Sequence, residues 1–417
     1  MDGRVPASIS CIAVVLQVNF CGKLSTDTSP AVRLEFIDMI GTWLLELNER
    51  WDHQGRLLPY LLSALIDSSA AVQQRALQHL DTIGALYEAD HEKDLKDVLA
   101  YLPSEAHSMG WRDTDAVWTE QLAAQRRILP AQFAARPRLG TRRVVAANFG
   151  HICHAICLEL VSWQAEHRAK AAQLLAVYLV HIEDWAQQYV NELAPALCRA
   201  LALQLPDRTM RDAPDTEQLI EASAAARCCA LMGLLASSAS FLSVVLPRIE
   251  DDSAELALQE AALLAATCNM HASACSTDGV DVDVQQILDA LQASGLPTHQ
   301  QVVCKRRLLS VLHACACCVQ SSTLQDTVVQ LLAMIMHACG RPEQAVANAA
   351  QSTAKAAMCA ALSRHVSAEH SGAVDGHTVA PWPAVQSWLH EHSGDVSEAL
   401  AVLGEDATDH GHWWSAT

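Results

Sequence analysis

The sequence predicts an all-α fold, an α-solenoid of stacked antiparallel helical hairpins of the HEAT/armadillo type. The segment Arg56–Leu80 shows the pattern of one complete hairpin, with two apolar stripes at helical spacing. The stripes consist of Leu57, Leu58, Leu61, Leu62 and Leu65, followed by Val72, Ala76, Leu80 and Ile83. Between them, Asp67-Ser68-Ser69 is expected to supply the turn and the N-cap, and Pro59 is expected one turn into the first helix. Because one hairpin cannot bury its own apolar face, further hairpins must stack on it.

The spacing of equivalent features is the second observation behind this fold. Val32-Arg33 follows Ser29-Pro30, which is a polar cap and then a proline at the first helical position. Val72-Gln73 holds the same place 40 residues later, inside the HEAT/armadillo period of about 40–47 residues. The helix from Pro30 to about Leu47 is therefore predicted to be an inner helix, with its outer partner only partly represented before it.

Composition supports packed helices and limits the function. Hydrophobic residues are 51% of the chain and aromatics only 5%, a balance that favours closely packed helices over sheets. The 47 acidic residues outnumber 28 basic ones and give a formal net charge of −19, so no nucleic-acid partner is expected. No membrane association is expected either, because no stretch approaches the ~20 uninterrupted apolar residues that span a bilayer.

The cysteines indicate the compartment. There are 15 of them, an odd number, and many lie in apolar helical runs, where a free Cys behaves as a small buried hydrophobe. This usage fits a reducing environment. The N-terminal apolar run is interrupted by polar residues and lacks a clear cleavage site, so a cytoplasmic protein is expected rather than a secreted one.

Further hairpins follow along the chain. A third unit is expected near Thr141–Trp163 with Arg168–Ile182, and a fourth opens at Trp185, where Pro195 stands at the place that Pro59 holds earlier. The later pairs are Phe241–Ile249 with Ala254–Cys268, Val282–Leu291 with Gln300–Val319, and Thr323–Ala338 with Pro342–Leu362, before a short helix at Ala384–Leu403. The predicted organisation is N-terminal HEAT repeats in 1–102, an insertion in 103–140, further HEAT-like repeats in 141–364, and a linker with a weakly structured tail in 365–417.

Three groups of Cys and His are candidates for metal sites. Cys153, His154 and Cys157 fall within about a third of a turn of one helix, whereas His151 points well away from Cys153. One rigid helix usually offers two ligands to a tetrahedral metal, and no partner pair at zinc-finger spacing follows. Buried packing residues are therefore expected here. The same holds for Cys315, Cys317 and Cys318, and local sequence drift accounts for His390, His392, His410 and His412.

Enzyme signatures are absent from the sequence, which contains no G-x-S-x-G, P-loop, G-x-G-x-x-G or H-E-x-x-H motif. His181, Glu183 and Asp184 form a compact acid–base group, but they stand where a repeat's inner helix ends. They are interpreted as a turn and the cap of a helix that starts at Trp185. No catalytic, cofactor-binding or metal-binding residue is assigned, no cofactor is expected, and the partner-binding residues remain unspecified.

Four segments carry a family resemblance: Thr42–Asp67, Glu92–Pro103, Arg136–Phe149 and Arg168–Asp184. Their sequences, order and spacing resemble the HEAT-repeat dynein axonemal assembly factors, the fifth of that named series. Members are longer, so a shortened member is expected, and Gln73 replaces the Arg often found after the Val of a HEAT inner helix. The resemblance implies a cytoplasmic, non-enzymatic factor for preassembly of the axonemal dynein arms of cilia and flagella. The implied partners are axonemal dynein heavy or intermediate chains and the Hsp90-type chaperone machinery.

Two other classes remain open on the residues alone. One is a different HEAT scaffold, of the nuclear transport or phosphatase type. The other is a Cys/His metal-binding or redox protein. For a scaffold, successive inner helices create an extended concave surface, and an acidic array is suited to shield basic or apolar surfaces of a client.

Overall fold

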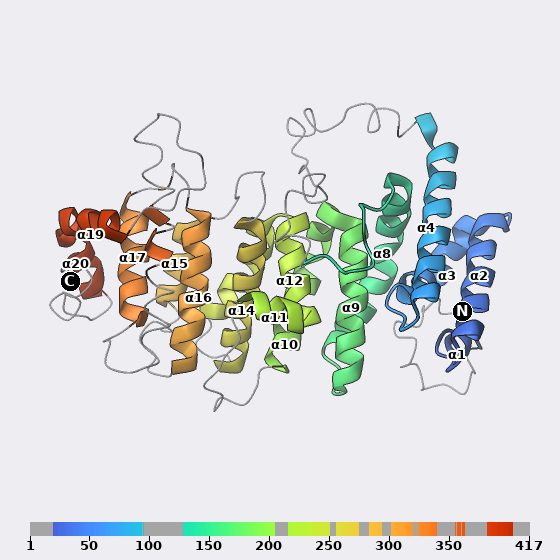
Figure 1. The fold of residues 1–417 in the computed structure, drawn as a ribbon, viewed down its shortest axis with the longest axis horizontal. Coiled ribbons are helices and arrows are strands. Elements are labelled where there is room, and N and C mark those ends of the chain that lie inside the picture. The colour runs from blue at the N-terminus through green and yellow to red at the C-terminus, as the bar shows by residue number, and fades with distance from the viewer. Residues whose placement is uncertain are drawn as a thin grey trace. The chain divides into compact units, whose positions relative to one another are not determined.

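The computed structural model describes residues 20–93, 95, 128–204, 216–250, 256–274, 283–293, 302–319, 323, 325–339, 355, 357–359, 361–362 and 382–402. Within these ranges the regular structure is helical and no strand occurs (Figure 1). The all-α prediction is confirmed. The chain divides into two compact units, one made of Met1–Leu203 with Ile220–Ser237 and Cys275–Asp278, the other of the remaining residues.

The first unit stacks helices in two rows. Its elements are α1 (Phe20–Ser25), α2 (Pro30–Glu46), α3 (Arg50–Ala64), α4 (Ala70–Asp90), α8 (Leu139–Leu160), α9 (Ala165–Ile182), the 3-10 helix η2 (Glu183–Tyr189), α10 (Val190–Ala202) and α12 (Ala224–Leu235). In the first row α3 packs on α8 and α8 on α10. In the second row α2 packs on α4 and α9 on α12. A row of first helices beside a row of second helices is the architecture of stacked hairpins.

The second unit repeats this plan. Its helices are α13 (Ser238–Glu250), α14 (Leu256–Ala274), α15 (Val284–Ala293), α16 (Val302–Cys318), α17 (Gln325–Cys339), α19 (Trp382–Glu391) and α20 (Ser393–Val402). Here α13, α15 and α17 pack in sequence, while α14 packs on α16. Among the described residues the predicted helices are present, except that the chain predicted to open a helix at Trp185 lies in η2 and the α-helix begins at Val190. Residues 103–127 of the predicted insertion and residues 340–354 lie outside the described residues. A short α11 (Thr216–Ala222) precedes α12.

Two predictions about single helices were wrong. The helix α3 begins at Arg50, so Pro59 lies in its interior and not one turn from its start. The chain after Ala384 forms two helices rather than one. The amide of His392 donates to the carbonyl of Trp388 at the end of α19. The helix is interrupted there because the next residues, Ser393 and Gly394, are weak helix formers, and α20 begins at Ser393.

A recurring contact fixes the start of the second-row helices. In α2, α4, α9 and α12 the fourth residue sends its side chain back to the carbonyl six residues earlier. The donors are Arg33 to Asp27 (2.7 Å), Gln73 to Asp67 (2.6 Å), Arg168 to Ser162 (2.8 Å) and Arg227 to Glu221 (2.9 Å). The replacement of Arg by Gln at residue 73 is thereby explained, because the Gln73 amide makes the same bond to the turn.

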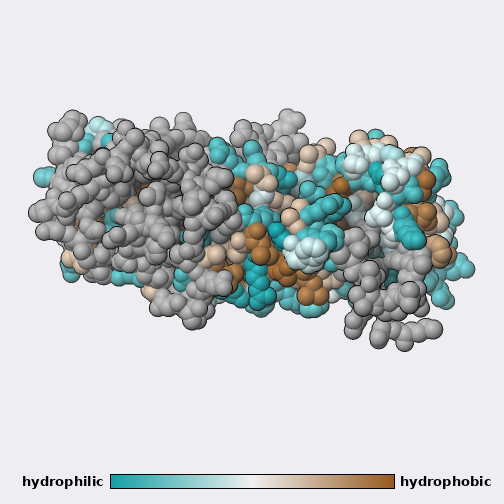
Figure 2. All heavy atoms as spheres, turned by 90° about the horizontal axis from the view of Figure 1, so that it is seen from below, coloured by the Kyte–Doolittle hydropathy of each residue, from teal (hydrophilic) through white to brown (hydrophobic). Residues whose placement is uncertain are grey.

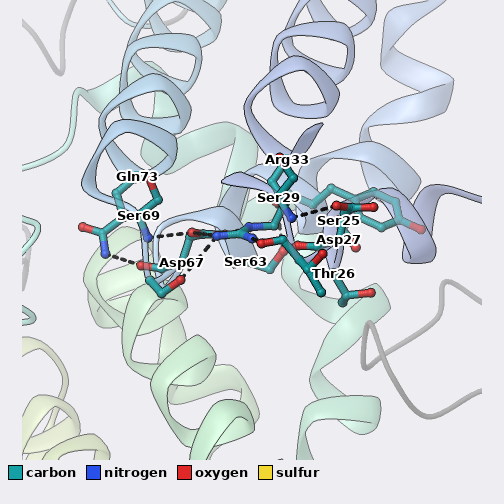
Figure 3. A network of polar contacts seen from close by, with 12 residues as sticks. Ser25, Thr26, Asp27, Ser29, Arg33, Ser63, Asp67, Ser69 and Gln73 are labelled. Carbon is teal, nitrogen blue, oxygen red and sulfur yellow. Dashed lines mark hydrogen bonds and ion pairs between the residues drawn. The ribbon is translucent and has the colours of Figure 1, made fainter. Parts of the chain in front are cut away.

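The expected serine caps work differently. The side chains of Ser29 and Ser69 make no capping hydrogen bond in α2 and α4. Instead, the carboxylate two residues earlier accepts the serine amide, from Ser29 to Asp27 at 2.8 Å and from Ser69 to Asp67 at 2.7 Å (Figure 3). Such aspartate turns position the chain for the next helix.

Among the described residues, no single helix is both long and apolar enough to cross a membrane. The bent pair Thr216–Ala222 and Ala224–Leu235 passes that test together, by length and composition only. The residues of α12 are mostly buried in the array, which accounts for their apolar character.

Candidate functional site

The helices α4 and α8 cross at very short range. A Cβ atom on Gly140 would lie 2.0 Å from the carbonyl oxygen of Gly84, and one on Gly84 would lie 2.1 Å from Oγ1 of Thr141. The hydroxyl of Thr141 donates to the carbonyl of Leu80 at 2.8 Å. Only glycine permits this approach, so the crossing is fixed by the residues at 84 and 140.

A carboxylate from α4 reinforces the crossing. Glu88 accepts the backbone amide of Gly140 at 2.8 Å through Oε1, and the Nη1 of Arg138 at 2.9 Å through Oε2. Arg138 also donates through Nε to Asp81 at 3.1 Å. Because the first amides of a helix lack internal partners, Glu88 caps α8 from a different hairpin.

A cleft lies between the two hairpins, away from this crossing. Ile156 and Glu159 lie 16 and 19 residues beyond Gly140 in α8, which is about 24–28 Å along the helix. At that end α4 and α9 are not among the tightly packed pairs of described helices. The space between them is a cleft of about 390 Å³, within the size range of ligand sites.

The cleft has an apolar floor and two polar walls. The floor residues are Phe36 and Ile37 of α2, Tyr60 of α3, Val72 of α4, Ile156 of α8 and Leu174 of α9. All six are buried, with Ile37, Val72 and Ile156 at most 2% exposed. One polar wall comes from the turns before α2 and α4, and the other from the end of α8 and the start of α9.

The first wall is centred on Arg33 (Figure 3). Its Nε and Nη2 donate to the two carboxylate oxygens of Asp67, and its Nη1 donates to the carbonyls of Asp27 and Thr28. A further bond joins Nη2 to the hydroxyl of Ser68 at 3.3 Å. The hydrogen bonds to Asp67 raise the pKa of Arg33 above its ordinary value. This wall is therefore saturated by contacts that hold the turns together.

The second wall contains a buried polar atom whose hydrogen-bonding capacity is not used within the described chain. The Oε2 atom of Glu159 is buried and has no hydrogen-bond partner among the described residues, and the Nδ1 of His167 lies 3.8 Å from it. Lys170, also on this wall, contacts Glu166 at 2.9 Å on the exposed side of α9. A buried carboxylate oxygen without a donor is costly, so Glu159 distinguishes this wall from the first.

Exposed apolar side chains lie close in sequence to the second wall. Trp163 stands in the turn between α8 and α9, four residues from both Glu159 and His167, and is 86% exposed. Leu158, near the end of α8, is 59% exposed. Figure 2 shows hydrophobic residues interrupting the hydrophilic surface of the described chain. Sequence reasoning missed this site, although a Trp in a polar turn is a signal that could have drawn attention to it.

The cysteines weighed as metal ligands lie on packed helices. Cys153 is 1% exposed, and its contact with Cys157 together with burial raises its pKa well above the ordinary range. The side chains of His151 and His154 are exposed on the same helix. Cys315 and Cys318 are buried as expected, whereas Cys157 and Cys317, for which burial was also expected, are only half-buried. The described residues contain no group of three or more potential ligands, and His410 and His412 lie outside them.

The acid–base group at the end of α9 has a structural role that the sequence did not reveal. Glu183 does not cap a helix at Trp185. It ends α9 with a positive φ of 47°, and its carboxylate accepts from Arg136 at 2.9 and 2.7 Å and from Arg142 at 2.6 Å. His181 donates from Nδ1 to the carbonyl of Val177 and packs edge-on against Phe133.

Glu183 thus ties the segment before α8 to the end of α9. Burial lowers the pKa of His181 to about 4, so its imidazole is neutral at pH 7. Burial and the charge of Glu183 raise the pKa of Asp184. Their contacts are those of packed structural groups.

Both sides of the α4–α8 crossing match models of one family. Residues 129–338 match the HEAT-repeat domain of dynein axonemal assembly factor 5, and residues 16–98 match the TPR repeats of dynein axonemal assembly factor 5-like proteins. The chain belongs to the dynein axonemal assembly factor 5 family. Asp27 and Asp67, which make equivalent turns, are 40 residues apart. That spacing fits the HEAT period better than the TPR period of about 34 residues.

Curated relatives carry the same family name. The chain is 26% identical over 321 residues to dynein axonemal assembly factor 5 of Homo sapiens, covering 76% of this chain and 33% of that protein. It is 31% identical over 174 residues to the Xenopus laevis protein, covering 41% of this chain and 18% of that one. The chain therefore spans a third or less of the length of these family members.

One solved structure, of Kap95p binding to RanGDP, aligns with 94% of this chain and 61% of its own at 12% identity. Its TM-score is 0.24, a value too low to support any inference about fold or partner.

Proposed function

We propose that this chain is a non-enzymatic cytoplasmic scaffold that holds axonemal dynein chains while dynein arms are preassembled for ciliary and flagellar motility. The observation that carries the proposal is its membership of the dynein axonemal assembly factor 5 family, whose name describes dynein assembly. Dynein heavy or intermediate chains are the proposed clients, and Hsp90-type chaperones the proposed co-workers.

The cleft between the α3–α4 and α8–α9 hairpins is the proposed contact for a client. It combines an apolar floor with a wall whose Glu159 lacks a hydrogen bond to one carboxylate oxygen. Binding sites in proteins commonly pair an apolar lining with a few polar groups. The strongest acid–base candidates, His181 and Glu183, are engaged in structural contacts, so the proposal gives them no catalytic role.

The test is affinity capture of the tagged chain from the cytosol of cells that are building cilia, followed by mass spectrometry. Unassembled axonemal dynein chains, recovered together with chaperones, are the expected result. Gly140→Val, which disrupts the α4–α8 crossing, serves as a control and should lose them. Recovery of nuclear transport or phosphatase subunits in place of dynein would overturn the proposal.

A further inference from the structure

We infer that the cleft binds an extended client segment in which an apolar side chain stands next to a lysine or arginine. This inference rests on the proposed function, since it specifies the chemistry of the client that the cleft receives. It follows from the apolar floor of the cleft, from the contacts that already occupy the cations lining it, and from the carboxylate oxygen of Glu159 that accepts no hydrogen bond from the described chain.

The floor selects an apolar side chain. Its residues come from five helices and are aliphatic or aromatic, with Tyr60 buried against Phe36 at a ring-centroid distance of 5.4 Å. A cleft of about 390 Å³ is large enough for a side chain with its adjoining backbone. Burying apolar surface there is favourable because water is released from both partners.

The cations of the cleft are committed to contacts within the chain. All the N–H groups of Arg33 that face the turns are used by Asp67, Ser68, Thr28 and Asp27. Lys170 lies against Glu166. An acidic ligand would have to displace one of these partners, so an anionic client segment is disfavoured.

One buried carboxylate of the cleft has an oxygen that accepts no hydrogen bond from the described residues. Glu159 has a side chain only 16% exposed, and its Oε2 atom has no hydrogen bond. A Lys or Arg of a client would supply a charge-assisted hydrogen bond to this oxygen, and such bonds are stronger than neutral ones. The formal net charge of −19 also favours the approach of a basic segment.

The mouth of the cleft suits an extended backbone. Gln173, whose exposed side-chain amide carries both donors and an acceptor, lies at the edge of the floor.

Fluorescence anisotropy with the full chain tests this chemistry. The probe is a fluorescein-labelled peptide, GSLRLSG, and its acidic twin is GSLELSG. The basic peptide should bind at least about tenfold more tightly than its twin. Glu159→Gln should weaken binding of GSLRLSG by about tenfold. Glu46→Gln, which removes the same charge from an exposed position that does not line the cleft, should leave it unchanged.

A second variant blocks the floor. Ala171 lines the cleft and is 8% exposed, so Ala171→Trp should fill it and abolish binding of both peptides, provided that circular dichroism shows unchanged helix content. Equal binding of the two peptides, or equal effects of Glu159→Gln and Glu46→Gln, would overturn the inference.

The dynein capture experiment separates this inference from the proposed function. If Ala171→Trp loses dynein chains while the two peptides bind alike, the proposed function stands and the client chemistry is wrong. If the peptides behave as expected but Ala171→Trp and wild type recover dynein equally, the client chemistry stands and the cleft is not the dynein contact.

Discussion

Arg33 in α2 donates through Nε and Nη2 to both carboxylate oxygens of Asp67, at 2.7 and 2.8 Å, across 34 residues of chain. Both side chains are about nine-tenths buried, at 10% and 11% exposure. This forked pair joins one hairpin to the turn of the next, and it forms the saturated wall of the cleft. A planar guanidinium is suited to this geometry, and a lysine is not.

Removal of that carboxylate should be strongly destabilising. Asp67→Ala leaves the Arg33 guanidinium without its main partner and the Ser69 amide without its acceptor, so the free energy of unfolding should fall by about 3 kcal/mol. Arg75→Ala is the matched control, because Arg75 is 45% exposed and 3.5 Å from Asp38, and should change it by less than about 0.5 kcal/mol. Urea unfolding measures both, and equal losses would refute the assignment.

The glycine crossing gives a second prediction. Gly140→Val places a branched side chain where a Cβ would meet the Gly84 backbone at 2.0 Å, so the array should lose about 3 kcal/mol or more of stability. Gly394→Ala in α20 meets nothing within 4 Å and should be neutral or stabilise by up to about 1 kcal/mol. Thermal unfolding compares the two. A tolerated Gly140→Val would show that α4 and α8 do not cross as described.

Glu183 gives a third prediction, in which glycine should be better tolerated than alanine. The carboxylate holds Arg136 and Arg142, with the Glu183 side chain 6% exposed, so Glu183→Ala should destabilise by about 3 kcal/mol. Its backbone has φ 47° and ψ −124°, a conformation that glycine adopts without strain. Glu183→Gly should therefore be about 1 kcal/mol less destabilising than Glu183→Ala. Chemical denaturation ranks the variants, and the opposite order would contradict the backbone assignment.

His181 predicts a pH dependence of stability. The unfolded chain binds a proton at this imidazole as the pH falls through about 6.5, while burial keeps the folded group neutral until about pH 4. Between these values the unfolded state binds more protons, so stability decreases as the pH falls. At about pH 5 the loss should be about 2 kcal/mol.

His181→Gln is the control for this effect, because glutamine does not titrate. Urea unfolding at about pH 7.5 and pH 5 should show a loss that is about 2 kcal/mol smaller in the variant than in wild type. Identical losses in both proteins would mean that His181 is not buried in its neutral form.

The sequence was sufficient for the hairpins and much of the core. Leu58, Leu61, Leu62 and Leu65 were predicted from periodicity alone and are at most 1% exposed, whereas Leu57 of the same predicted stripe is only half-buried. Periodicity works here because a helix in a stacked array must bury one face. The equivalence of Arg33 and Gln73 was also visible from a spacing of 40 residues, although the shared bond to the turn carbonyl was not.

The cleft could not be predicted in the same way. It depends on how α4 meets α8, and that geometry is set by Gly84, Gly140 and Glu88, which belong to segments more than 50 residues apart. A glycine inside a helical pattern reads only as a weak helix former. Glu159 gave no signal at all, because a Glu near a helix end is ordinary until its neighbours in space are known.

Photo-crosslinking from inside the cleft tests the central claim most directly. Benzoylphenylalanine is placed at Gln173, which is exposed and lines the cleft, or at Gln78, an exposed residue of α4 that does not line it. The tagged chains are irradiated in cytosol from cells building cilia. The account predicts covalent adducts with axonemal dynein chains from position 173 and not from position 78. Dynein chains that co-purify without crosslinking at 173, or that crosslink equally from both positions, would contradict it.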